Sequence, residues 1–107
     1  MKPKVTIEEA VQKLNQEESQ RFTLLMEHGS MQLEYYAPRG SDPQTPHKKD
    51  ELYLIVSGSG YFNRNGIREE FGWGDVLFVP AGMMHRFEDF TDDFATWVVF
   101  YGPDGGE

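Results

Sequence analysis

The chain has 107 residues, and its 10 Lys and Arg stand against 18 Asp and Glu, which gives a formal net charge of −8. The lack of cysteine excludes disulfide scaffolds, cysteine zinc sites and thiol catalysis, and the acidic balance disfavours nucleic acid and anionic membranes as partners. No apolar run approaches the ~20 residues of a membrane span and no signal peptide is recognisable, so we expect one soluble, cytoplasmic domain.

One helix is predicted, close to the N-terminus. Thr6 is followed three residues later by Glu9, which fits a capping box. Ile7, Val11 and Leu14 then recur at helical spacing, so they are expected to share one face over about three turns. We expect this helix to pack on the outside of the domain or on a partner subunit.

After the helix, segments rich in β-forming residues alternate with turns. Asn65-Gly66 is a strong hairpin signal, because a tight primed turn needs positive φ. Such short strands with closely spaced turns favour an all-β sandwich or barrel over a parallel α/β fold. Strands are predicted at 21–27, 31–37, 51–56, from 61 onward, and at 67–71, 76–79, 85–88 and 95–101.

The expected organisation has three parts. Residues 1–20 form a helical extension, residues 21–102 form a single barrel, and the Gly-rich residues 103–107 form a loose, flexible tail.

Two of the three histidines lie in settings that suggest a site. His47 and Glu51 are four residues apart, and Glu51 opens the strand at 51–56. In an extended chain these two side chains point the same way as Tyr53 and Ile55, which directs them inward. A buried imidazole and a buried carboxylate need a metal, each other or a water-filled cavity as a partner.

Two segments resemble the conserved motifs of the cupin superfamily. Residues 74–85, GDVLFVPAGMMH, resemble the second motif, G-x5-P-x-G-x2-H-x3-N, with Asp89 in the place of its final Asn. His47, Glu51 and Gly58 resemble the second half of the first motif, G-x5-H-x-H-x3,4-E-x6-G. Both occur in the expected order.

The resemblance implies a double-stranded β-helix, or jelly-roll, barrel with one divalent metal inside, which cupins typically hold with three His and one Glu. Transferred by position, His47, Glu51 and His85 are ligands, whereas Thr45 stands where the first His belongs. Three interpretations stay open. Thr45 leaves the position to water, Gln44 is rotated inward by a bulge and binds through its amide oxygen, or no metal binds.

Two His and one carboxylate suit non-haem Fe(II) with open positions, and the same set serves catalytic zinc. Fe, Zn, Mn and Ni therefore all stay open.

The resemblance implies a metal-dependent enzyme acting on a small organic molecule, of dioxygenase or sugar/uronate isomerase type. The alternatives are a non-catalytic module that binds a small ligand or metal, and a degenerate barrel used only for oligomerisation. Similarity to other small cupins implies a homodimer.

Several residues have plainer interpretations. His28 lies beside a turn and is expected to be exposed, and residues 48–50 (KKD) are expected to form a solvated strip at the barrel rim. Met83 and Met84 either line the pocket or fill gaps in the core, the more usual role of methionine. His47 and Glu51 also fit a satisfied polar pair in the mouth of a barrel.

Overall fold

The computed structural model describes residues 2–17 and 19–107. All eight predicted strands are confirmed, with ends that differ from the expected bounds by one residue at most. The elements are α1 (Ile7–Leu14), β1 (Phe22–His28), β2 (Met31–Tyr36), β3 (Asp50–Ser57), β4 (Gly60–Arg64), β5 (Ile67–Phe71), β6 (Val76–Val79), β7 (His85–Glu88) and β8 (Ala95–Tyr101).

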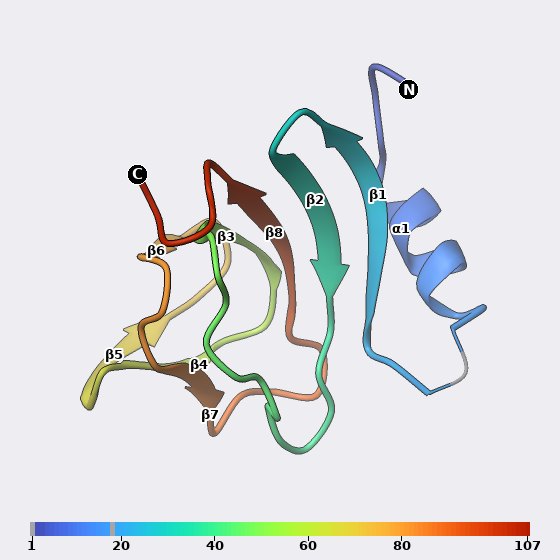
Figure 1. Cartoon of the computed structure of the whole chain (residues 1–107). Coiled ribbons are helices and arrows are strands. Elements are labelled where there is room, and N and C mark those ends of the chain that lie inside the picture. Colours follow the sequence, from blue (N-terminus) through green and yellow to red (C-terminus); the bar gives the residue numbers. More distant parts are fainter. Residues whose placement is uncertain (1, 18) are drawn as a thin grey trace.

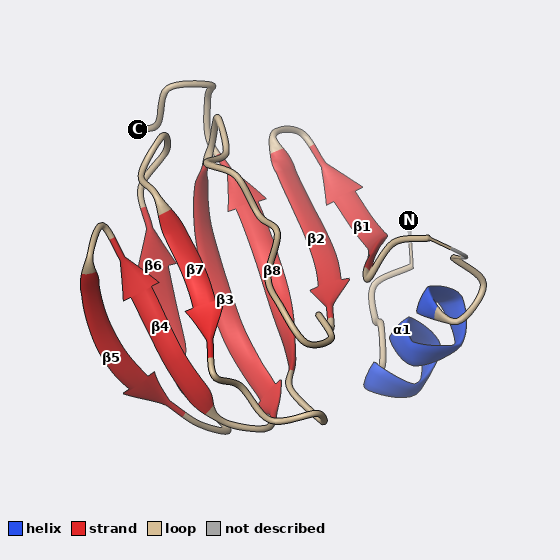
Figure 2. Ribbon diagram, turned by 90° about the horizontal axis from the view of Figure 1, so that it is seen from below, coloured by secondary structure: helices blue, strands red, loops and turns tan. Residues whose placement is uncertain are grey.

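The strands form two antiparallel sheets that face each other across the core. One sheet has five strands in the order β1-β2-β8-β3-β6, and the other has three in the order β5-β4-β7. In both views β1 and β2 lie on the side away from β4, β5 and β7 (Figures 1 and 2). The arrangement is the predicted jelly-roll barrel.

Alternation along β3 and β8 defines an inner and an outer face of the larger sheet. Glu51, Tyr53 and Ile55 are buried, whereas Leu54 between them is exposed. Across the ladder, Val98 of β8 is opposite Tyr53 and is likewise buried. The inner face meets three aromatic residues of the smaller sheet, which pack into the same core: Phe62, Phe71 and Phe87.

The helix α1 covers part of the outer face, beside β1 (Figure 1). Ala10 and Leu14 are its buried residues and pack in a second apolar cluster with Tyr35. Of the three residues predicted to share one face, only Leu14 is buried, since Ile7 is 46% and Val11 39% exposed. The small side chain of Ala10 lets the helix approach the sheet closely. The spacing of Ile7, Val11 and Leu14 did not identify Ala10 as the point of contact.

Thr6 caps the helix, as predicted. The Thr6 hydroxyl accepts a hydrogen bond from the Glu9 backbone N–H at 3.1 Å, as a capping residue should. The Glu9 carboxylate reaches back to Thr6, whose hydroxyl lies 3.4 Å from Glu9 Oε1, and it also accepts from the Lys2 ammonium at 2.6 Å. The lysine and the reciprocal contact with Thr6 both lower the pKa of the Glu9 carboxyl.

The C-terminal tail is bonded to the start of β3. The Asp50 carboxylate, which is buried, accepts from the backbone N–H groups of Ala81 at 2.8 Å and Glu107 at 3.0 Å. Gly105 N–H donates to the Lys48 carbonyl at 2.7 Å. The expectation of a solvated strip at residues 48–50 is thus wrong for Asp50, whose oxygens are occupied by backbone donors.

No helix among the described residues has the length and apolar character needed to cross a membrane.

Gly58, the last residue of the first motif, lies where two segments of the backbone approach each other closely. Gly58 has φ of +81° and a Cβ added there would lie 2.6 Å from Phe94 Cα, next to a fully buried core ring. Gly74 has a similar φ of +84°, but its added Cβ would meet none of the described heavy atoms within 4 Å.

Alanine substitutions at Gly58 and Gly74 distinguish the cost of backbone strain from the cost of steric overlap. Gly74→Ala should cost about 1–2 kcal/mol, because an L-residue resists the left-handed region. Gly58→Ala should cost roughly 1–3 kcal/mol more, because the core must also shift around Phe94. Urea unfolding of both variants measures the difference, and equal losses would show that the contact with Phe94 is not limiting.

Candidate metal centre

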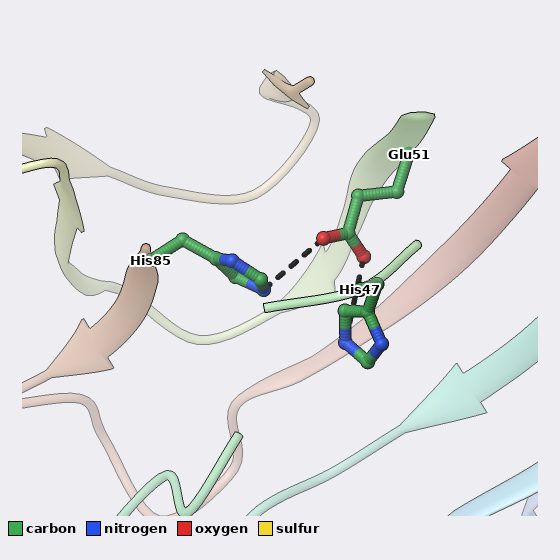
Figure 3. Close-up of side chains that lie close together, drawn as sticks. All are labelled: His47, Glu51 and His85. Carbon is green, nitrogen blue, oxygen red and sulfur yellow. Dashed lines mark ion pairs between the residues drawn. The ribbon is translucent and has the colours of Figure 1, made fainter. Parts of the chain in front are cut away.

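His47, Glu51 and His85 come from three separate segments and meet at one point (Figure 3). His47 lies in the loop before β3, Glu51 is the second residue of β3, and His85 is the first residue of β7. Each offers a ligand atom within 4.8 Å of the others. Since β3 and β7 belong to different sheets, the cluster connects the two halves of the barrel.

The carboxylate of Glu51 lies between the two imidazoles. Its Oε1 is 3.1 Å from His85 Nε2, and its Oε2 is 3.9 Å from His47 Nε2. Glu51 is 1% exposed and His85 is 3% exposed, whereas His47 is only partly buried. Within the described part of the chain, Glu51 Oε2 and His85 Nε2 are buried atoms without a hydrogen-bond partner.

The hydrogen-bond partners of His85 indicate that the contact between His85 Nε2 and Glu51 Oε1 lacks a proton or a cation. His85 Nδ1 lies 3.0 Å from the Met83 carbonyl oxygen, which can only accept, so Nδ1 carries the hydrogen. In the neutral imidazole, Nε2 then presents a lone pair to the Glu51 oxygen, and two acceptors this close in a buried site need a proton or a cation between them. The Nδ1 bond to a carbonyl is also the partner that metal-ligating histidines commonly have. The residues therefore fit a metal ion.

Burial moves both titrating groups toward their neutral forms. It raises the pKa of Glu51 from 4.5 to about 8 against the opposing effect of the Tyr53 hydroxyl, and the nearby carboxylates of Glu34 and Asp42 add smaller effects in the raising direction. It also lowers the pKa of His47, and the neighbouring His85 adds to that effect. A neutral imidazole is the form that binds a metal, and a cation would favour the ionised carboxylate.

Gln44, and not Thr45, turns toward the cluster. The Gln44 amide oxygen lies 3.2 Å from His47 Nε2 and accepts a hydrogen bond from the Tyr53 hydroxyl at 3.0 Å. Thr45 is exposed. Of the interpretations left open by the sequence, the inward amide is the one that has the corresponding geometry.

A pocket of about 480 Å³ opens beside the cluster. His47 and Gln44 line it, and the inner faces of β2 and β8 provide Glu34, Tyr36 and Phe100 among its other walls. Burial raises the pKa of Glu34, with no opposing effect from a cation or hydrogen bond of the described residues. Glu34 was not among the residues predicted from the sequence, although its place two residues before Tyr36 in a predicted strand puts both on the same face.

The remaining predicted residues lie away from the cluster. His28 is exposed at the end of β1, as expected. Met83 packs against the core, whereas Met84 is largely exposed. Asp89 has φ of +48° and its carboxylate pairs with Arg68 at 2.8 Å. Asn and Asp tolerate this left-handed conformation better than other side chains, which explains why Asp can replace the motif's Asn.

Comparison with known proteins gives a consistent result. Residues 32–101 match the family model described as "Cupin domain". An uncharacterised protein of Streptomyces coelicolor is 36% identical over 64 residues, which are 60% of this chain and 61% of that protein. An acireductone dioxygenase of Leishmania infantum is 40% identical over 62 residues, 50% of this chain but only 17% of the enzyme.

The fold comparison agrees with the sequence comparison. The crystal structure of a cupin 2 conserved barrel domain protein from Salinispora arenicola superposes with a TM-score of 0.64 at 24% identity, covering 76% of this chain and 74% of that one. At this identity the similarity establishes the fold alone. The chain spans about three fifths of the Streptomyces relative and about a sixth of the dioxygenase.

The raised pKa of Glu51 predicts how stability depends on pH in chelator-treated protein. Between about pH 4.5 and 8 the native state keeps a proton that the unfolded chain has lost, so the free energy of unfolding should fall as pH rises through this window. The loss should be on the order of a few kcal/mol. Glu51→Gln should flatten the dependence, and Glu69→Gln, an exposed carboxylate on β5, should leave it as it is. Urea unfolding across pH 4–9 measures it, and a wild-type curve that rises with pH would contradict it.

Proposed function

The chain belongs to the cupin family, and on that premise we propose that it binds one divalent metal ion and acts there on a small organic substrate. The proposed ligands are His47, Glu51 and His85, with the Gln44 amide oxygen as the fourth. The observation that carries the proposal is the 3.1 Å contact between Glu51 Oε1 and His85 Nε2, at a place where His85 Nε2 and Glu51 Oε2 are buried without a hydrogen-bond partner among the described residues.

The donor set is chemically suited to such an ion. Two imidazole nitrogens and two oxygens match the preferences of Fe, Mn, Zn and Ni. A bound ion of this kind would supply Lewis-acid polarisation of a substrate oxygen or, as Fe(II), reactivity toward dioxygen. Of the four ligands, His47 and Gln44 also line the pocket, so a substrate there lies directly beside the ion's proposed position.

The pocket walls provide the other requirements of a reaction. Val98 and Phe100 give an apolar surface that excludes water from one side of a bound molecule. Glu34 contributes a carboxyl group whose burial favours the protonated form, so it is suited to exchange a proton with a substrate hydroxyl or carbonyl. The volume of about 480 Å³ limits the substrate to a small molecule.

Among the reaction types that the fold supports, we favour the dioxygenase. The support is the 40% identity with an acireductone dioxygenase over half of this chain. The segment is a small part of that enzyme, so the acireductone is a starting substrate for the test rather than an assigned one. A module that binds a ligand without turning it over is the alternative.

Metal analysis tests the first part of the proposal. Chain purified without a His tag or chelator, or reconstituted with Fe(II), Mn(II), Ni(II) or Zn(II), should contain one ion per chain by elemental analysis. His85→Ala should lose it, because three donors would remain around a buried cavity. His28→Ala removes an exposed histidine and should keep full occupancy. Full occupancy in His85→Ala would show that the ion binds elsewhere.

Dioxygen uptake tests the second part. The Fe(II)-loaded chain should consume dioxygen in proportion to added acireductone, and His85→Ala should reduce the rate at least about a hundredfold, since it removes a ligand. An oxygen electrode with the His28→Ala chain as the active control provides the measurement. Metal binding and saturable substrate binding without dioxygen uptake would favour the non-catalytic alternative.

A further inference from the structure

A buried carboxylate outside the proposed ligand set holds the Gln44 side chain in place. Asp42 lies in the loop between β2 and β3 and is 3% exposed. Its oxygens accept four hydrogen bonds: from the Tyr36 hydroxyl at 2.5 Å, the Phe87 backbone N–H at 2.9 Å, and the Gln44 backbone N–H at 3.2 Å and side-chain Nε2 at 2.9 Å.

These contacts decide which end of the Gln44 amide faces the cluster. An ionised carboxylate only accepts hydrogen bonds, so it pairs with the NH2 end of the amide and excludes the oxygen from that side. The oxygen must then point the other way, toward the Tyr53 hydroxyl at 3.0 Å and His47 Nε2 at 3.2 Å. Only the oxygen of a neutral amide has a lone pair that a metal ion can use.

We propose that Asp42 is the positioning residue that fixes the Gln44 amide with its oxygen toward the metal, an inference that rests on the function proposed above. Asp42 itself does not touch the ion. It acts by making the wrong amide orientation costly, because a flipped amide would place two acceptor oxygens against each other in a buried site.

The same carboxylate connects two segments that carry ligands. Through Gln44 it holds the loop that continues to His47, and through the Phe87 N–H it holds β7 two residues after His85. The Tyr53 hydroxyl then steadies the amide oxygen from the opposite side without using both of its lone pairs. The fourth ligand is therefore held at both ends before any ion binds.

A double-mutant cycle tests the proposal with Zn²⁺ alone as the probe, by calorimetric titration of chelator-treated full-length chain. Asp42→Asn gives the amide a neutral partner that can donate as well as accept, so Zn²⁺ affinity should fall about 10–100-fold. Gln44→Ala should cost a similar factor. The double variant should bind no more weakly than Gln44→Ala alone, since Asp42 acts only through that side chain.

Tyr61→Phe is the matched control, because it likewise removes a tyrosine hydroxyl that donates to a carboxylate, that of Glu70, but one away from the proposed ligands and the pocket. It should change Zn²⁺ affinity less than about threefold, even if thermal stability falls. Losses that add in the double variant, or an unchanged affinity in Asp42→Asn, would overturn the role of Asp42. Failure of the wild-type chain to bind any ion would instead refute the proposed function.

A second measurement covers the case in which Asp42→Asn does not fold. In ¹⁵N-labelled wild-type chain, the Gln44 side-chain NH2 signals, assigned by their loss in Gln44→Ala, should be protected from solvent exchange. Protection should persist at saturating Zn²⁺, because the NH2 group stays on Asp42 while the oxygen binds. Loss of this protection on Zn²⁺ addition would overturn the proposal.

Discussion

The structure depends on a carboxylate buried between two imidazoles. Glu51 lies on the inner face of β3, a strand paired with β8 on one side and β6 on the other, so it cannot turn to solvent without breaking the alternation that buries Tyr53. Removing such a group from water is costly unless a proton or a cation compensates it. A purely structural barrel would be more stable with an apolar residue here, and this is the physical argument for the metal-binding function proposed above.

The unequal size of the two sheets explains why the buried cluster is still accessible. Three strands cannot cover the inner face of five, and β1 and β2 lie on the uncovered side (Figures 1 and 2). The irregular loop before β3 closes part of this gap, and the space it leaves is the pocket. His47 and Gln44 belong to that loop, so the proposed ligands nearest the pocket are also those held by loop contacts rather than by a strand ladder.

Local patterns were enough to predict the strands, whereas the three members of the cluster were predicted as a set from the resemblance to the cupin motifs. Each strand of the barrel has its own apolar alternation or turn signal, and His47, Glu51 and His85 occur at motif spacings. Gln44 could not be separated from Thr45, because the choice is made by a contact with Asp42, and Asp42 is fixed by Phe87, 45 residues away. The burial of Asp50 depends in the same way on Ala81 and on the last residue of the chain. Contacts between residues so far apart in the sequence leave no periodic pattern from which they could be predicted.

In the proposed site, the Gln44 amide takes the role of the family's first histidine, whose position in the sequence is Thr45, and this changes the character of the site more than its charge. Both imidazole and amide are neutral ligands, so the ion is still balanced by the single carboxylate of Glu51. The oxygen is the harder donor, however, and it shifts the set toward the carboxylate and carbonyl environments that suit Mn and Fe rather than soft ions. An amide oxygen is also a weaker ligand than an imidazole, and so its orientation must be fixed by neighbours. A buried carboxylate that accepts four hydrogen bonds is what makes such a ligand usable.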